Sequence, residues 1–283
     1  MTTSRGPVEY LDSGSGDVIL SLHGALGGYD QSQILARTIG ETRFRYLSLS
    51  RPGYLGTPLA AGETPEAQAD LFVEVIDLLG IGKVVVFAIS GGGPSAIYFA
   101  IRHLDRCRGL VLVSTIGGKA TYRIPFSFNA MMLLTKWPAF VGIMKRKAEK
   151  NLDQNLRRAI SDPAILERTV KNPEVMSLYR ELAVGCFYRI AERIEGTKND
   201  IKISRTRTYP LKEIAVPTLV IHGTKDPLLP FEEHARRLAK EIPGAQLLAA
   251  EGGGHGAIFT HREEIQSKVA TFIQMLNGEE RRK

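Results

Sequence analysis

Cysteine is nearly absent from the 283-residue sequence, which contains only Cys107 and Cys186. The two residues lie far apart and show no spacing typical of a zinc site or a CxxC redox centre, so neither site can be built on cysteine. A disulfide framework would also need more cysteines than these. We therefore interpret both as reduced, partly buried thiols of a cytoplasmic protein.

The sequence also lacks a long apolar segment near its N-terminus. The first strong apolar run, Val18 to Leu22, is too short for the hydrophobic core of a signal peptide. Three acidic residues, Glu9, Asp12 and Asp17, precede this run. Both features favour a cytoplasmic location.

Glycine-rich nucleotide-binding loops are missing as well. The stretch Gly91 to Gly93 follows an apolar run, but it lacks the Gly-x-Gly-x-x-Gly spacing and the Gly-Lys-Ser/Thr ending of phosphate-binding loops. No internal repeat is evident, and the only low-complexity segment is the charged tail Glu279 to Lys283. The sequence therefore predicts no nucleotide cofactor.

Apolar residues are plentiful, and charge is unevenly distributed. Hydrophobic residues make up 43% of the sequence, which fits one large domain or a domain with an insertion. The net charge is +7. Lys119 to Pro210 contains 18 Lys and Arg against 9 Asp and Glu, a net +9, whereas the remainder contains 19 against 21, a net −2. Either this segment attracts anionic esters or anionic lipid, or its cations are ordinary solvated helix faces.

The most informative local pattern surrounds Ser90. A β-branched apolar run after Lys83 predicts a buried strand, and Ser95 to Ile101 predicts a helix. The residues two positions before and after the serine, Ala88 and Gly92, are small. Strand, tight turn, serine and helix are typical of a nucleophile elbow, in which the close approach of strand and helix requires small neighbours.

Strand and helix patterns alternate on both sides of this elbow. The alternation predicts an α/β fold with a mostly parallel central sheet and helices on both faces. The expected strands are an edge strand, Val8–Leu11, and inner strands at Val18–Leu22, Phe44–Leu49, Arg108–Val113, Pro217–Ile221 and Gln246–Ala250.

The alternation stops after Ser114 and resumes at Pro217. The residues between them show no strong strand pattern, and roughly 100 residues without structure would be an uncommon loop. We therefore predict a helical cap, or lid, of residues 117–210, inserted into a core domain of residues 1–116 and 211–283.

Four motifs are similar to those of a known family. They are His23-Gly24-Ala25, the elbow Ala88 to Gly92, His222-Gly223-Thr224-Lys225-Asp226, and Gly254-His255. In this order they resemble the α/β-hydrolase family, of the serine hydrolase or esterase type with an inserted helical cap. The likeness covers nearly the whole chain. Ala88 replaces the usual glycine of the elbow, and Ser50 stands where related hydrolases often have Asp.

A serine nucleophile needs a base to take its proton and an acid to orient that base. The resemblance implies the order Ser90, acid, histidine. The acid candidate is Asp226, which follows a strand, because residues 114–118, where some relatives carry the acid, contain no carboxylate. The base candidate is His255, in a glycine-rich turn after a strand. We interpret the other histidines as solvated (His103, His234), a helix cap (His261), structural (His222) or out of order for the base (His23).

The resemblance also implies two backbone N–H donors for the oxyanion of a tetrahedral intermediate. They belong to Gly91, after the serine, and to Ala25, after His23-Gly24. Leu26, one residue further on, is the alternative to Ala25. Each such donor typically contributes about 2.7–4 kcal/mol to transition-state stabilisation.

The cap opens with an apolar run, Ile124 to Met144. We expect Phe126 and Trp137 of this run to line the substrate pocket, together with Leu26 and Tyr29 of the core. In the resembling family, a cap at this place covers the active site.

The run as a whole has two interpretations. It is either cap core and pocket wall, or a lid that makes weak peripheral contact with lipid, helped by Lys145-Arg146-Lys147 and Lys150. A transmembrane span is disfavoured because Asn129, Lys136 and Pro138 fall within the run.

The residues and the resemblance together predict a serine hydrolase that cleaves a small-molecule carboxylic ester through an acyl-enzyme on Ser90. One alternative is hydrolysis of a carbon–carbon bond beside a ketone, and another is a non-catalytic ligand receptor. The receptor has no need of Ser90, Asp226 and His255 together. We expect no cofactor, no metal and no nucleic-acid partner, since the scattered basic residues of the cap match no reader motif.

Overall fold

The computed structural model describes residues 1–40, 43–121, 126–160 and 162–280, with only the backbone for residues 126, 127, 279 and 280. Among these residues, seven strands form one sheet in the order β3-β5-β4-β6-β7-β8-β9. Their bounds are β3 Tyr10–Gly14, β4 Val18–Leu22, β5 Arg45–Leu49, β6 Val84–Ile89, β7 Cys107–Val113, β8 Thr218–Gly223 and β9 Gln246–Ala250. A separate small ladder pairs β1 (Thr2–Thr3) with β2 (Gly6–Pro7).

The sheet is parallel except at its first edge, where β3 runs antiparallel to β5. The edge strand begins two residues later than expected from the sequence. The reason is that Val8 donates its N–H to the carbonyl of Met1, and Glu9 donates its N–H to Thr57 Oγ1, 3.0 Å away. The predicted α/β fold with a mostly parallel sheet is confirmed.

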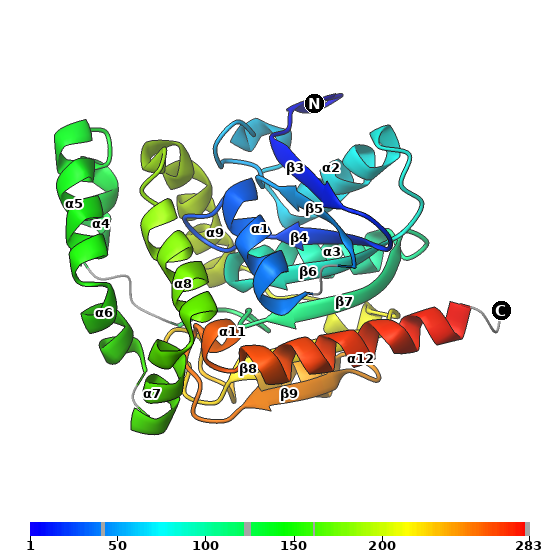
Figure 1. Ribbon diagram of the computed structural model, residues 1–283. Helices are drawn as coiled ribbons and strands as arrows, with labels where there is room; N and C mark the ends of the chain where they lie inside the picture. The colour runs from blue at the N-terminus through cyan, green and yellow to red at the C-terminus, as the bar shows by residue number, and fades with distance from the viewer. Residues whose placement is uncertain (41–42, 122–125, 161, 281–283) are drawn as a thin grey trace.

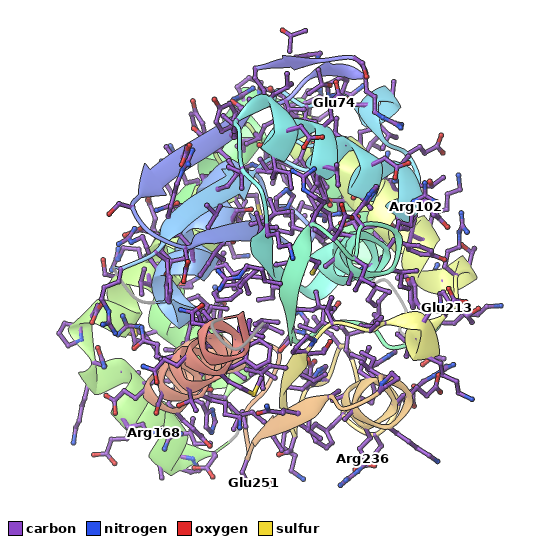
Figure 2. All side chains as sticks on the ribbon, turned by 90° about the vertical axis from the view of Figure 1, so that its right-hand side faces the viewer. Glu74, Arg102, Arg168, Glu213, Arg236 and Glu251 are labelled. Atoms are coloured by element: carbon purple, nitrogen blue, oxygen red, sulfur yellow. The ribbon has the colours of Figure 1, made fainter. Side chains whose placement is uncertain are left out.

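Helices cover both faces of the sheet (Figures 1 and 2). One face carries α1 (Tyr29–Ile39) and α12 (Arg262–Glu280), and the other carries α2 (Pro65–Leu78), α3 (Gly93–Arg102) and α10 (Ala235–Glu241). Along β6, Val86 and Ala88 join the core on one face, and Val85 and Phe87 join the core on the other. Each fully buried Val or Phe stabilises the fold by roughly 1.5–3 kcal/mol relative to an exposed one.

Thr64 and Pro65 start α2 as a capped helix. The Thr64 side-chain oxygen accepts the N–H of Ala67 at 3.2 Å, and Pro65 occupies the first helical position, where no intrahelical N–H is needed. Gly80 follows the helix at φ +65°, a left-handed conformation that glycine adopts without strain. The chain can therefore turn back at once into β6.

Between β7 and β8 the described chain is helical. Its elements are α4 (Phe126–Leu134), α5 (Pro138–Lys150), α6 (Leu152–Ala159), α7 (Pro163–Lys171), α8 (Pro173–Gly185), the short 3-10 turn η3 (Ile190–Arg193), α9 (Ile194–Thr206) and a second 3-10 turn, η4 (Leu211–Glu213). Pro138, Pro163 and Pro173 occupy the first turns of α5, α7 and α8, where a missing backbone N–H costs no intrahelical hydrogen bond. Figure 1 shows α4 and α5 at the outer end of this layer, with α8 and α9 between them and the sheet.

In the described part of the chain, every helix is too short or too polar to cross a membrane.

Candidate active site

Ser90 lies at the tip of a strained turn between β6 and α3. Its φ of +50° falls in the left-handed region that a serine rarely adopts. Ser90 is also the first residue of a 3-10 turn, η2 (Ser90–Gly92), which leads into α3. A Cβ atom placed on Gly92 would lie 2.8 Å from the carbonyl oxygen of Leu22 and 2.7 Å from that of His23. A side chain at position 92 would therefore push the elbow away from β4.

Three predicted site residues meet above this turn. His255 Nε2 lies 3.2 Å from Ser90 Oγ, and His255 Nδ1 lies 2.8 Å from Asp226 Oδ2. Ser90 follows β6, Asp226 follows β8 and His255 follows β9, so all three stand at the carboxyl edge of the sheet. A proton on Nδ1 donated to Asp226 leaves Nε2 free to accept the serine proton.

Asp226 is held in its ionised form by the groups around it. Burial alone raises the pKa of this carboxyl, but hydrogen bonds from His222 and His255 outweigh burial and hold the pKa well below its ordinary value. The backbone N–H groups of Leu228 and Leu229 also donate to Asp226 Oδ1, at 2.9 and 3.0 Å. The carboxylate can therefore orient His255 and stabilise its imidazolium form.

The two predicted oxyanion donors lie beside the serine. A Cβ atom built on Gly91 would be 3.5 Å from the backbone nitrogen of Ala25, so these segments are neighbours. Leu26, the alternative donor, already gives its N–H to Thr197 Oγ1 at 2.9 Å. The geometry therefore favours Ala25 over Leu26 as the partner of Gly91.

The turn that carries Ala25 is fixed by a buried, neutral histidine. His23 Nδ1–H donates to the carbonyl of Gly24 at 2.7 Å, and His23 Nε2 accepts the backbone N–H of Arg51 at 3.0 Å. Burial lowers the pKa of His23 well below its ordinary value, and the positive charge of Arg51 lowers it further. Because the ring is neutral, it can accept one hydrogen bond and donate the other.

A buried aspartate from the cap completes this network. Asp200 of α9 accepts hydrogen bonds from both terminal nitrogens of Arg51. It also accepts a hydrogen bond from the hydroxyl of Tyr54, 2.5 Å away. Burial and Asp200 raise the pKa of Tyr54 well above its ordinary value, so Tyr54 stays protonated and donates. Sequence reasoning missed this pair, because an Asp on a helix rich in charged residues resembles any solvated residue.

A cavity of about 470 Å³ opens over the serine, between core and cap. Most of its walls are apolar, and they include no Lys or Arg among the described residues. The polar side chains in the lining are those of Gln31, Ser90, Cys186, Thr197, Asp200, Ser204 and His255. Burial raises the pKa of the free thiol of Cys186 to about 11, so the thiol stays protonated and does not compete with Ser90 as a nucleophile.

Gln31 differs from the other polar side chains of the lining. It is buried on α1, and its amide nitrogen has no hydrogen-bond partner among the described residues. A buried amide without a partner is costly, which makes this group a natural donor to a bound ligand.

The predicted pocket residues are only partly those observed. Leu26 lines the cavity as expected, but Tyr29 and Trp137 do not. Tyr29 starts α1 and lies close to the charges of Glu9 and Asp30, outside the lining. Trp137 precedes α5 and is 65% exposed, because α4 has already carried the chain past the cavity. The side chain of Phe126 lies outside the described residues.

Phe128, two residues after Phe126 in α4, is the aromatic residue of this helix that does line the cavity. His234, interpreted from the sequence as solvated, is buried instead, because it lies under the Ile116–Gly118 turn and its Nδ1 accepts the N–H of Gly117 at 3.3 Å. In the part of the chain that the structure describes, no group of three or more His, Cys, Asp or Glu could hold a metal ion.

Comparison with known proteins gives three relevant similarities. A family model described as alpha/beta hydrolase fold matches residues 17–262. An uncharacterized hydrolase of Bacillus subtilis, YcgS, is 28% identical over 262 residues, which cover 90% of each chain. A 2-hydroxy-6-oxononadienedioate/2-hydroxy-6-oxononatrienedioate hydrolase of Burkholderia vietnamiensis is 24% identical and covers 94% of this chain and 91% of its own.

Among solved structures, an alpha/beta hydrolase fold protein from Nakamurella multipartita superimposes with a TM-score of 0.81. It is 28% identical, and the match covers 96% of both chains. The similarity therefore extends over the helices between β7 and β8 as well as the sheet.

Proposed function

The chain belongs to the α/β hydrolase fold family, and from this premise we propose that it is a serine hydrolase that cleaves carboxylic esters. The observation that carries the proposal is the hydrogen-bonded chain from Ser90 Oγ through His255 to Asp226. Ser90 lies on the floor of an apolar cavity, beside the backbone N–H groups of Ala25 and Gly91.

In the proposed reaction, His255 Nε2 takes the proton of Ser90 Oγ as the oxygen attacks the ester carbonyl carbon. The electron pair of the carbonyl moves to its oxygen, which accepts hydrogen bonds from Ala25 and Gly91. The intermediate then collapses, the C–O bond to the alcohol breaks, and His255 gives its proton to the leaving alkoxide. A water molecule releases the acid from the acyl-enzyme by the same steps.

The cavity supports an uncharged and mainly apolar substrate. A carboxylate moved into this space would lose its hydration, and the described lining offers no cation to compensate. The one carboxylate already there, Asp200, is balanced by Arg51. Gln31 can donate one hydrogen bond to a carbonyl or ether oxygen of the substrate.

Hydrolysis of a carbon–carbon bond beside a ketone is the second candidate. It is supported by the relatives named 2-hydroxy-6-oxononadienedioate hydrolases, which match this chain over more than nine-tenths of their length. Their named substrates are dicarboxylates. The lack of Lys and Arg in the described lining favours a neutral ester over such a dianion.

A substrate screen separates the two candidates and also tests catalysis itself. The substrates are p-nitrophenyl esters of graded chain length and a vinylogous diketone, each offered to the wild type and to Ser90→Ala. A fluorophosphonate probe should label the wild type once, on Ser90, and the wild type should cleave the esters. Faster cleavage of the diketone would favour the second candidate. Equal turnover by Ser90→Ala would refute a serine mechanism, and no turnover of any substrate together with no labelling would favour a receptor.

A further inference from the structure

The helix α5 has an apolar first half, yet it buries no residue completely. Three large apolar side chains on and before this helix are exposed to solvent: Leu133 at 74%, Trp137 at 65% and Ile143 at 56%. Leu133 lies in α4, and Trp137 joins the two helices. We call this surface, together with the cations Lys136, Arg146, Lys147 and Lys150, the outer cap face.

The core of the cap does not need these side chains. On the other side of α4 and α5, Phe128, Met132 and Val141 already pack with Ile190 and Ile194. The two helices therefore satisfy their inner contacts and still present apolar groups outward, at the end of the molecule farthest from the sheet (Figure 1). Exposed apolar residues gathered in this way mark an interaction surface.

The cations of the outer cap face are arranged around its apolar residues. Ile143, Arg146, Lys147 and Lys150 follow the spacing i, i+3, i+4, i+7, which places them on one side of α5. Lys136 directly precedes Trp137. None of these four cations forms an ion pair with a described residue.

The surface of the core is different. Figure 2 shows where Arg102 and Arg236 lie on this surface, and each forms an ion pair with an acidic side chain. Arg102 Nε lies 3.0 Å from Asp70 Oδ1, and Arg236 Nε lies 2.5 Å from Glu232 Oε2. These two core arginines are paired, whereas the four cations of the outer cap face have no ion-pair partner among the described residues and surround three exposed apolar side chains.

We propose that the outer cap face binds the surface of an anionic lipid bilayer. Trp137 would lie at the level of the headgroups, Leu133 and Ile143 would enter the boundary of the acyl chains, and the cations would contact anionic headgroups. A second copy of this chain fits less well, because a symmetric contact would press the same cations against one another. Phe128 of α4 lines the cavity, so the helix that meets the lipid also forms a wall of the active site.

Trp137 is the only tryptophan in the sequence, so its fluorescence reports on the outer cap face without a label. Vesicles of phosphatidylglycerol and phosphatidylcholine should shift the emission to shorter wavelength and carry the protein down on centrifugation. Vesicles of phosphatidylcholine alone should do neither, and salt should weaken the binding. Ser90→Ala should bind vesicles like the wild type, so the outcome does not depend on the proposed catalysis.

Matched variants test whether the contact uses this face. The double variant Arg146→Glu and Lys147→Glu should lower the partition coefficient by at least about fivefold for each cation that is reversed. Replacing two exposed core lysines, Lys83 and Lys240, with Glu should change the partition coefficient little. Ile143→Ser should weaken binding, and Leu104→Ser, an equally exposed leucine of the core, should not.

Several results would overturn the proposal. They are equal binding to neutral and anionic vesicles, equal losses in the core and cap variants, or no binding to vesicles at all. A Trp137 shift that needs no lipid and grows with protein concentration would instead identify a second copy as the partner. Light scattering without vesicles measures that outcome directly.

Discussion

Asp200 of α9 and Arg51, which follows β5, form a buried ion pair next to the turn that carries Ser90. Arg51 Nη1 lies 2.9 Å from Asp200 Oδ1, Arg51 Nη2 lies 2.5 Å from Asp200 Oδ2, and both side chains are almost fully buried. Arg51 also donates through Nε to the carbonyl of His23 at 2.8 Å. One aspartate of α9 therefore helps to fix the turn that presents Ala25, the proposed oxyanion donor.

The first prediction follows from removing the charge of Asp200. Asp200→Asn leaves the guanidinium of Arg51 buried without its anion, and breaking a buried pair in this way typically costs about 3–5 kcal/mol. The variant should unfold at lower urea concentration, and its kcat should fall because the turn at Ala25 is less well held. Equilibrium unfolding followed by circular dichroism, together with ester turnover, measures both effects.

An exposed ion pair provides the control for Asp200→Asn. Glu181 pairs with Arg37 at 2.7 Å, but about half of each side chain is exposed. Glu181→Gln should therefore change stability by less than about 1 kcal/mol. If both variants lost the same stability, burial of the Asp200 pair would not be the cause.

The second prediction concerns the acid of the site. Asp226→Asn should keep the hydrogen bonds from Leu228 and Leu229 and hence the local fold, but it should allow His255 the wrong tautomer. The equivalent change in a serine protease lowers turnover by about 10⁴. Steady-state ester hydrolysis measures the loss. Glu251→Gln, a carboxylate in the turn after β9, is the matched control and should retain activity; the opposite pattern would show that the acid is misassigned.

The third prediction is a pH dependence of stability that arises from His23. Burial lowers its pKa in the folded protein, whereas the unfolded chain binds a proton as pH falls through about 6.5. The unfolded state then holds more protons than the folded state, so stability falls as the solution becomes more acidic. A single such group contributes a slope of about 1.4 kcal/mol per pH unit within this window.

His23→Asn should flatten this slope between about pH 6.5 and pH 5, because Asn can still accept and donate hydrogen bonds but does not titrate there. Denaturant unfolding at a series of pH values measures the free energy. His234 and His261, whose pKa values burial also lowers, contribute in the same direction, so part of the slope should remain. An unchanged slope in His23→Asn would show that His23 is not neutral in the folded protein.

Local patterns predicted the sheet, and the resemblance to the α/β-hydrolase family, together with strand order, predicted the meeting of Ser90, Asp226 and His255. Parallel strands place their carboxyl ends together, so three residues that follow three such strands become neighbours. The choice between Ala25 and Leu26 could not be made in this way, since it depends on Thr197, 171 residues away. The same applies to Asp200, whose partner is set by the docking of α9.

The pocket prediction failed at Trp137 for a related reason. An apolar run with helical periodicity identifies two sides of a helix, but it does not say which side meets the cavity. In α4 and α5 the inner side carries Phe128 and Val141, and Trp137 falls in the turn between the two helices.

The last prediction separates two effects of charge on substrate choice. The positive cap should attract an anionic ester from a distance, and this attraction should weaken with salt because the screening length is only about 8 Å at physiological ionic strength. The cavity should act in the opposite direction, since its described lining has no Lys or Arg and contains the carboxylate of Asp200. Burial of an unpaired carboxylate costs several kcal/mol, and a cost of about 1.4 kcal/mol already lowers kcat/KM tenfold.

A matched pair of esters, one neutral and one carboxylated at the far end of the acyl chain, tests both effects. The carboxylated ester should show a kcat/KM at least about tenfold lower at every salt concentration, and only its value should fall further as salt rises. A higher kcat/KM for the carboxylated ester would mean that a cation reaches the cavity, and it would revive the dicarboxylate substrates of the carbon–carbon hydrolases. Equal salt responses of the two esters would show that the cap charge does not guide substrate, which would leave lipid binding as the remaining role of the outer cap face.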